Sequence, residues 1–335
     1  MYLETDFDEL AMFQGSHQGL NERHCCISAR EERRLPYLYL PRVVYLQHRI
    51  LKDPHNQHVP MVLSQVPKRF SAFPPPNMSN ARTHTKIAGT PDYDDPIFWD
   101  TKFATGQDVG EWLNPGENLV QAVLSHLDNR SSVQERSPRV LHLGPGISKL
   151  GTKLREAFVD RDWKGSGIVN VDFSSEAVRL GQEIESKQNP SHAMHWLRAD
   201  LRSWNDMSSL APLAPFDIII DKSTSDAIAT SPSTTLSPTS ISQDTCPVVR
   251  DVANTQGQTT LSPVELLALH LVPLTIEGTM WFSLSYSTMR FDNLPRLANH
   301  WDLVSRTPLK APQGQTSSFA HAPEVFHWLY ILRRK

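Results

Sequence analysis

The second half of the chain alternates short apolar runs with amphipathic segments, and this alternation limits the possible folds more than any other feature. Four runs have the length of a strand: Val140–Leu143, Ile168–Val171, Met194–Leu197 and Phe216–Ile220. Between the first two, Leu150, Leu154 and Phe158 recur at helical spacing. Strands that alternate with helices are typical of a parallel sheet with helices on both faces. We therefore predict a doubly wound, Rossmann-like α/β fold.

Further helices and strands follow the same scheme. Ser174 is a suitable N-cap for a helix that runs through Glu183. Ser262 and Glu265 form a capping box that predicts a helix through about His270. Three more strands are predicted, with a turn at Gly278 before the first of them: Thr279–Leu284, Trp301–Val304 and Val325–Leu332. The expected sheet is therefore seven-stranded and mostly parallel.

Proline outnumbers glycine, 25 to 15, which indicates long irregular segments. Some of the prolines are clustered at Pro74–Pro76, in a stretch without sustained periodicity. Others lie in a Ser/Thr/Pro-rich stretch at about 230–260 that has little to bury. We predict a largely irregular N-terminal extension over 1–92, a folded domain over 93–335, and a mobile or disordered insertion within that domain at about 230–260.

Composition excludes several classes of protein. The 335 residues carry a net charge of −3, which is atypical of a nucleic-acid binder. No apolar run reaches the roughly 20 residues that span a bilayer. Three cysteines cannot build a disulfide framework, and the sequence His24-Cys25-Cys26 lacks a second pair at metal-ligand spacing. We expect a cytoplasmic monomer without a metal site, a membrane anchor or a nucleic-acid partner.

The first predicted strand ends in Gly144-Pro145-Gly146, immediately before a helix. In a doubly wound sheet, ligands bind beyond the carboxyl ends of the strands near the topological switch point. Small residues at this turn let the backbone approach a ligand, although glycines alone also serve simply to make a turn. A dinucleotide-binding loop needs a third glycine where this chain has Lys149, which argues against NAD and FAD.

Acidic residues follow three successive strands: Asp172, Asp200 and Asp221. Carboxylates along one rim of a sheet suit a ligand with a ribose, an amine and positive charge. Asp172 is placed to accept both ribose hydroxyls and Asp200 to accept from an exocyclic amine. The structural alternative is that each aspartate caps a helix, which is worth about 1 kcal/mol.

This order of motifs resembles the seven-β-strand, S-adenosylmethionine-dependent methyltransferases. Within that class the chain is most similar to the lysine methyltransferases of elongation factor 1A. Phe98–Phe103 resembles their Tyr-Trp-Asp-x-Arg-Tyr segment, and Glu111-Trp112-Leu113 resembles their Glu-Trp-Phe or Glu-Trp-Tyr. Asp221–Ala227 matches five of the seven residues of their Asp-Lys-Gly-Thr-Leu-Asp-Ala. In this chain Ser223 replaces the glycine of that motif, and Lys102 replaces the arginine of the first segment.

The resemblance implies S-adenosyl-L-methionine as cofactor and transfer of its methyl group to a protein lysine, with a translation elongation factor as one possible protein substrate. Asp221 is the expected catalytic residue, an acidic group that faces the transferred methyl group and the acceptor amine. We expect Lys222 and Asp226 to brace the turn through a salt bridge. The cofactor site is expected to comprise Trp99, Gly144, Pro145, Gly146, Asp172, Phe173, Asp200 and Leu201. The substrate site is expected to comprise Trp112, Lys222 and Ser223.

Two other classes of function remain open at this point. The same fold could methylate N, O or S of a small molecule, because the N-terminal extension and the insertion suit a remodelled pocket as well as a protein-docking surface. It could also be a non-catalytic binding protein, although such a protein would have no reason to keep the whole set of glycines and aspartates. Hydrolase signatures such as Gly-x-Ser-x-Gly and His-Glu-x-x-His do not occur in the sequence.

Overall fold

The computed structural model describes residues 91–106, 111–129, 136–312 and 324–335. All of these belong to one unit, residues 76–335, of the two into which the chain divides. The predicted extension over 1–92 lies outside the described residues except for its last two positions, and so does His24-Cys25-Cys26.

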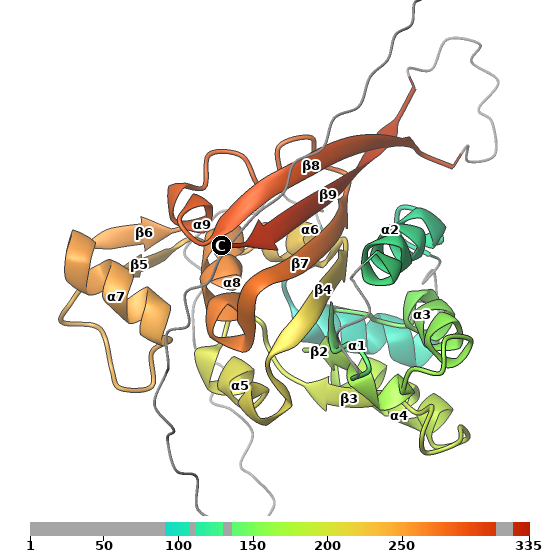
Figure 1. Cartoon of the computed structure of the whole chain (residues 1–335). Coiled ribbons are helices and arrows are strands. Elements are labelled where there is room, and N and C mark those ends of the chain that lie inside the picture. The colour runs from blue at the N-terminus through green and yellow to red at the C-terminus, as the bar shows by residue number, and fades with distance from the viewer. Residues whose placement is uncertain (1–90, 107–110, 130–135, 313–323) are drawn as a thin grey trace, which may run out of the picture. The chain divides into compact units, whose positions relative to one another are not determined.

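A seven-stranded sheet forms the centre of the unit (Figure 1). Its strands are β1 (Val140–Leu143), β2 (Ile168–Asp172), β3 (His195–Arg198), β4 (Phe216–Lys222), β7 (Thr275–Ser285), β8 (Trp301–Lys310) and β9 (Phe326–Arg334). The spatial order is β3-β2-β1-β4-β7-β9-β8. The first five strands of that order pair in parallel, and β9 runs antiparallel to both of its neighbours. The predicted doubly wound, mostly parallel sheet is confirmed.

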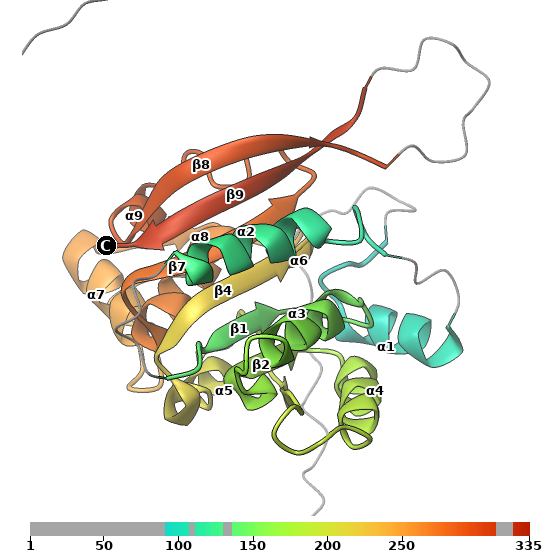
Figure 2. The same cartoon turned by 45° about the vertical axis from the view of Figure 1, so that its right-hand side comes forward.

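Helices cover both faces of this sheet (Figure 2). They are α1 (Pro96–Thr105), α2 (Glu117–Asp128), α3 (Leu150–Val159), α4 (Ser175–Glu185), α5 (Trp204–Ser208), α6 (Thr224–Ile228), α7 (Pro247–Gln256), α8 (Pro263–Leu271) and α9 (Pro295–Ala298). On one face, α2 and α3 pack on the sheet through residues such as Val123 and Leu154. On the opposite face, α8 packs through residues such as Leu267. Ser174 and Ser262 cap α4 and α8 as predicted.

The central strand β4 shows why neighbouring residues reach different environments. All seven of its residues are buried, as the apolar run predicts for a strand covered on both faces. Ile218 and Ile220 join the core beneath α2 and α3, whereas Ile219 joins the core beneath α8. Because side chains alternate along a strand, Lys222 points to the first of these faces and Asp221 to the second.

Two strands are longer than their sequences predict. β7 begins at Thr275 and runs through Gly278, where a turn was expected. Gly278 has φ +85°, and the pairing of β7 with β4 shifts register between Phe216 and Ile218, so this glycine lies in an irregularity of the strand. β8 continues to Lys310 because it is an outer strand of the sheet, where polar residues after Val304 remain exposed without breaking the pairing.

The Ser/Thr/Pro-rich stretch is folded, which contradicts the prediction of a mobile insertion. It contains α7 and an antiparallel pair of strands, β5 (Thr234–Leu236) and β6 (Thr259–Leu261). The buried side chains of Cys246, Val249 and Leu261 form a small core with Leu266 and Leu269 of α8. The apolar residues are sparse along the sequence, but they converge on a helix that the sheet already holds in place.

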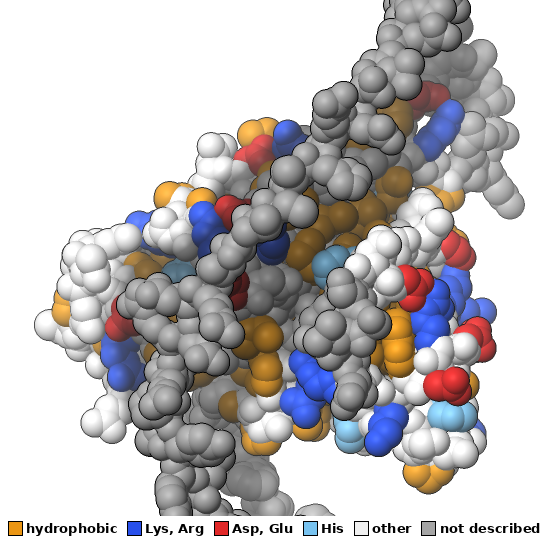
Figure 3. All heavy atoms as spheres, in the orientation of Figure 1, with side chains coloured by type: hydrophobic (Ala, Val, Ile, Leu, Met, Phe, Trp, Pro, Cys, Tyr) orange, Lys and Arg blue, Asp and Glu red, His pale blue; other side chains and the backbone are white. Residues whose placement is uncertain are grey.

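The face that carries α2, α3 and α4 displays acidic and basic side chains side by side (Figure 3). Several of them are paired, as in Lys153 with Glu117 and Arg161 with Asp128 at 2.9 Å. Exposed pairs of this kind each contribute only about 0–1 kcal/mol to stability. Within the described ranges, no helix is long and apolar enough to cross a bilayer.

Candidate ligand-binding site

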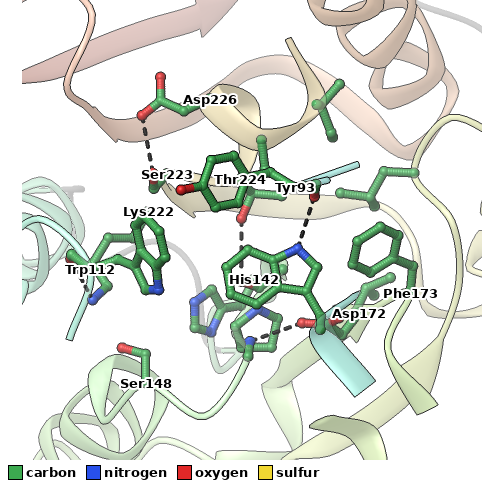
Figure 4. Close-up of a pocket in the computed structure, with 18 of the residues that line it drawn as sticks. Tyr93, Trp112, His142, Ser148, Asp172, Phe173, Lys222, Ser223, Thr224 and Asp226 are labelled. Carbon is green, nitrogen blue, oxygen red and sulfur yellow. Dashed lines mark hydrogen bonds between the residues drawn. The ribbon is translucent and has the colours of Figure 1, made fainter. Parts of the chain in front are cut away.

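A cavity of about 640 Å³ lies at the carboxyl ends of β1, β2, β3 and β4. This is the edge of the sheet where ligands bind in doubly wound folds, and its volume falls within the roughly 300–1,000 Å³ of small-molecule sites. The cavity brings together every residue predicted for the cofactor and the substrate: Trp99, Gly144, Pro145, Gly146, Asp172, Phe173, Asp200, Leu201, Trp112, Lys222 and Ser223 (Figure 4). Asp221, the predicted catalytic residue, does not line it.

The turn after β1 is made of glycine because no larger residue fits there. Gly144 and Gly146 have φ of +52° and +53°, in the left-handed region. A Cβ on Gly144 would lie 2.4 Å from Oγ1 of Thr224, and one on Gly146 would lie 3.1 Å from the ring of Phe103. The turn therefore brings bare backbone to the wall of the cavity.

Asp172 holds that turn in place from the end of β2. Its Oδ2 accepts a hydrogen bond from the backbone N–H of Gly146, and its Oδ1 accepts from the N–H of Ser174, both at 2.9 Å. Burial raises the pKa of Asp172 to about 6. A carboxylate offers about four lone-pair positions, so Asp172 can still accept from the hydroxyls of a ligand in the cavity.

Asp200 meets a partner that the sequence did not reveal. The guanidinium of Arg202 binds both of its carboxylate oxygens, with Nε 2.9 Å from Oδ1 and Nη2 2.7 Å from Oδ2. Arg202 also lies over the ring of Phe173, 5.9 Å from its centroid. All three residues line the cavity, so a base at this end would meet a neutralised ion pair and not an isolated carboxylate.

Asp221 does not line the cavity in which the methyl group and the acceptor are expected to meet. Its Oδ1 accepts from the backbone N–H groups of Thr224 (2.8 Å) and Ser225 (3.1 Å), in the first turn of α6. Its Oδ2 accepts from Oγ of Ser283 at 2.8 Å. Asp221 is fully buried, and burial raises its pKa to about 6. The capping alternative therefore describes this aspartate.

Lys222 pairs with Glu111, so the predicted salt bridge between Lys222 and Asp226 is wrong. Nζ of Lys222 lies 2.5 Å from Oε2 of Glu111 and 3.2 Å from the backbone carbonyl of Trp112. Glu111 also accepts from the N–H of Lys149 at the start of α3. Burial opposes the charge of Glu111, but these hydrogen bonds hold its pKa below the usual value. Alternation along β4 explains the error, because Lys222 projects toward α3.

Asp226 lines the cavity and organises its mouth. Its carboxylate pairs with Arg290 at 2.7 Å, and it accepts from Oγ of Ser285 and from the backbone N–H of Tyr286. Oγ of Ser223 donates to it at 3.2 Å. Ser223 has φ +67°, in the left-handed region that favours glycine, the residue of the resembled motif at this position.

The aromatic segment, which comprises residues 93–103 and 111–113, forms one wall of the cavity. Nε1 of Trp99 donates to the backbone carbonyl of Tyr93 at 2.8 Å. The Trp99 ring stacks on Phe103 at 5.5 Å and meets Trp112 at 5.6 Å between centroids. Trp112 is 40% exposed, so it stands at the rim of the cavity and not in the core.

Asp100 anchors the aromatic segment to α4. Its Oδ1 accepts from Oγ of Ser174 (2.6 Å) and from the N–H of Glu176 (3.0 Å), and its Oδ2 accepts from Oγ of Ser175. Burial opposes its charge, yet these bonds hold the pKa of Asp100 below the usual value. Carboxylates of the segment thus satisfy helix N-termini on both sides of Asp172, with Glu111 at α3 and Asp100 at α4.

His142 lines the cavity from β1 and was missed by the sequence reasoning, which assigned no role to any histidine. Its Nδ1 lies 2.8 Å from Oδ1 of Asn170 on β2. Burial lowers the pKa of His142 to about 4, so the ring is neutral at physiological pH. The available signal was its place two residues before Gly144, on a strand whose other residues are apolar.

Comparison with known proteins gives matches in structure only. No protein-family model matches the chain, and no curated protein matches it. One similar structure is the N-methyltransferase NodS from Bradyrhizobium japonicum in complex with S-adenosyl-L-homocysteine, which is 12% identical, with 73% of this chain and 99% of that chain covered and a TM-score of 0.41. Another is an S-adenosylmethionine-dependent methyltransferase from Anabaena variabilis, which is 9% identical, with 72% and 93% covered and a TM-score of 0.39. A third is TrmN from Thermus thermophilus, which is 16% identical, with 70% and 53% covered and a TM-score of 0.38. The assignment of the fold rests on the strand order of this chain and not on these scores.

Proposed function

We propose that this chain is an S-adenosylmethionine-dependent methyltransferase whose acceptor is a protein lysine. One observation carries the proposal: the glycine turn after β1 and Asp172 at the end of β2 are hydrogen-bonded to each other at the wall of a cavity large enough for a nucleoside ligand.

The residues of the cavity fit such a cofactor. Asp172 can accept from ribose hydroxyls, and Phe173 and Leu201 supply apolar walls for a base. Bare backbone at Gly144 and Gly146 permits close approach of the cofactor's sulfonium-bearing amino-acid chain. S-Adenosylmethionine, when bound, supplies both the methyl group and the leaving group. The protein then needs mainly to orient the acceptor, which can be worth up to about 7–11 kcal/mol.

The rim of the cavity suits an amine acceptor. Trp112 is 40% exposed and Tyr286 is 57% exposed, and both line the cavity. Aromatic faces attract a methylated ammonium by about 0.5–2 kcal/mol. Asp226 also lines the cavity, and its pairing with Arg290 neutralises its charge. A lysine that enters past this rim meets little net negative charge, and desolvation then favours the neutral amine that attacks the methyl group.

The resemblance of Phe98–Phe103, Glu111-Trp112-Leu113 and Asp221–Ala227 to the elongation factor 1A lysine methyltransferases supports a protein acceptor. The structure adds that residues of all three segments line one cavity and that the Glu111–Lys222 ion pair joins the second segment to the third. An elongation factor is therefore the first substrate to test.

Calorimetry with S-adenosylhomocysteine tests the cofactor, and absence of binding would overturn the proposal. Incubation with methyl-labelled cofactor and either a protein lysate or a metabolite extract then tests the acceptor, with purified elongation factor 1A as a third arm. We expect label on a lysine of a protein. Label confined to the metabolite extract would replace a protein acceptor with a small molecule. Binding without transfer to any arm would indicate a non-catalytic protein. The Gly146→Val variant, which we expect not to bind the cofactor, is the matched control for each arm.

A further inference from the structure

His142 presents a ring nitrogen to the cavity without a protein partner. The residue is 1% exposed, yet its ring lies at the floor of the cavity, below Lys222 and Thr224 in Figure 4. Nδ1 is engaged by Asn170. Within the described part of the chain, no group forms a hydrogen bond with Nε2. Nε2 is not one of the fully buried polar atoms, so it is accessible from the cavity, where a bound ligand can supply a partner.

Asn170 determines which nitrogen of His142 carries the proton. The amide nitrogen of Asn170 donates to the backbone carbonyl of His195 at 3.3 Å and contacts the sulfur of Met194 at 3.5 Å. The amide oxygen therefore faces His142 and accepts from Nδ1–H. In a neutral imidazole the other nitrogen is then an acceptor, so Nε2 seeks a hydrogen-bond donor. Burial lowers the pKa of His142 and keeps the ring in this neutral form.

The layout of the strand ends indicates which donor that is. β3, β2, β1 and β4 lie in this order across the cavity. If Asp172 at β2 takes the ribose and the end of β3 takes the base, the amino-acid part of the cofactor extends toward β1 and β4. The hydroxyls of the ribose and the amino group of the base then already have acceptors. The α-ammonium group is the hydrogen-bond donor of the cofactor that still lacks one. The charge of Lys222 on this side is neutralised by Glu111, so a second cation is admissible.

We propose that Nε2 of His142 accepts a hydrogen bond from the α-ammonium group of the cofactor's amino-acid part. This inference rests on the proposed function. It makes His142 a cofactor-specificity residue, one that distinguishes a ligand with an α-amino group from the same ligand without it.

A double cycle, in which both the ligand and residue 142 are changed, tests this contact. Calorimetry compares S-adenosylhomocysteine with its analogue that lacks only the α-amino group, for the wild type and for His142→Phe and His142→Leu. We expect the wild type to prefer S-adenosylhomocysteine by about 10-fold or more, because hydrogen bonds to charged groups are among the stronger ones. In the variants this preference falls to within about 2-fold, mainly through weaker binding of S-adenosylhomocysteine.

Both substitutions remove Nδ1–H and leave the oxygen of Asn170 unpaired, which lowers stability. Thermal melting shows which of the two variants stays nearer to the wild type, and the calorimetry relies on that variant. If the wild type binds both ligands equally, the inference is overturned without any variant, and the proposed function stands. A preference that survives in a folded variant also overturns it. Failure of the wild type to bind S-adenosylhomocysteine instead contradicts the proposed function itself.

Discussion

The ends of β2 and β4 carry the same chemical group in the same kind of cap, but only one of the two belongs to the cavity. Asp172 and Asp221 are both buried, both accept from two backbone N–H groups, and both have a pKa raised to about 6 by burial. Each lies beside a turn in the left-handed conformation, made by Gly146 in one case and Ser223 in the other. The two carboxylates point to opposite faces of the sheet, which explains why Asp172 lines the cavity whereas Asp221 supports α6.

The largest effect is expected at the turn beside Asp172. Gly146→Val places a β-branched residue at φ +53° and a Cβ 3.1 Å from Phe103. A left-handed conformation alone costs about 1–2 kcal/mol for a residue with a side chain, and the contact adds to it. We expect binding of S-adenosylhomocysteine to fall below detection by calorimetry while the far-ultraviolet circular dichroism spectrum persists. Wild-type affinity in the variant would show that the turn does not touch the ligand.

The second effect concerns pH and Asp221. The folded protein retains this proton up to about pH 6, whereas the unfolded chain releases it near 3.8. The unfolding free energy due to Asp221 therefore falls as pH rises between these values, by up to about 3 kcal/mol, and stays lower above them. In Asp221→Asn this decline should be absent, since Oδ1 keeps both amides and the new amide can donate to Ser283. Denaturant unfolding from pH 4.5 to 7.5 measures the difference between wild type and variant.

The same substitution at Asp172 should act on binding. Both oxygens of Asp172 accept from backbone N–H groups, so the amide of Asp172→Asn must oppose one of them. We expect S-adenosylhomocysteine to bind about 30-fold more weakly, which corresponds to about 2 kcal/mol. Asp221→Asn is the matched control and should change the affinity by less than about 2-fold. Equal losses in the two variants would remove the distinction between the two strand ends.

The smallest effect is expected at the turn beside Asp221. Ser223→Gly relieves a left-handed serine, which should raise the unfolding free energy by about 0.5–1 kcal/mol. The lost hydrogen bond to Asp226, at 3.2 Å, offsets part of this gain. Ser223→Ala loses the bond without relieving the backbone and serves as control. If glycine is no more stable than alanine here in denaturant unfolding, the turn is not strained.

Much of the sheet and half of the site could be read from local sequence. The strand-end positions of Asp172 and Gly146 follow from apolar runs and from the need for small residues at a turn, and both are short-range signals. Alternation along β4 predicts the face of the sheet to which Asp221 points. Whether Asp221 also caps α6 depends on the residue at which that helix begins, and the sequence does not fix this residue. Strand-end position alone therefore did not separate a ligand residue from a capping residue.

Contacts that join distant parts of the chain were the ones missed. Lys222 pairs with Glu111, which is 111 positions away, and a closer aspartate was the natural expectation from sequence. Arg202 and Asp200 are two positions apart in the sequence, but only the fold places the Arg202 guanidinium over Phe173. The small core around Cys246 was missed for the same reason, because its residues gain their apolar neighbours from α8.

The carboxylates of the aromatic segment that accept hydrogen bonds at the starts of α3 and α4 also bear on where the folding unit begins. A chain shortened to start at Val140 would retain every strand of the sheet, yet it would leave amides at the starts of both helices without the acceptors Glu111 and Asp100. Such a fragment should lose stability at the helices that flank the cavity before it loses the sheet. We therefore expect the smallest autonomously folding piece of this protein to start ahead of α1, with the wall of the cavity as part of its scaffold.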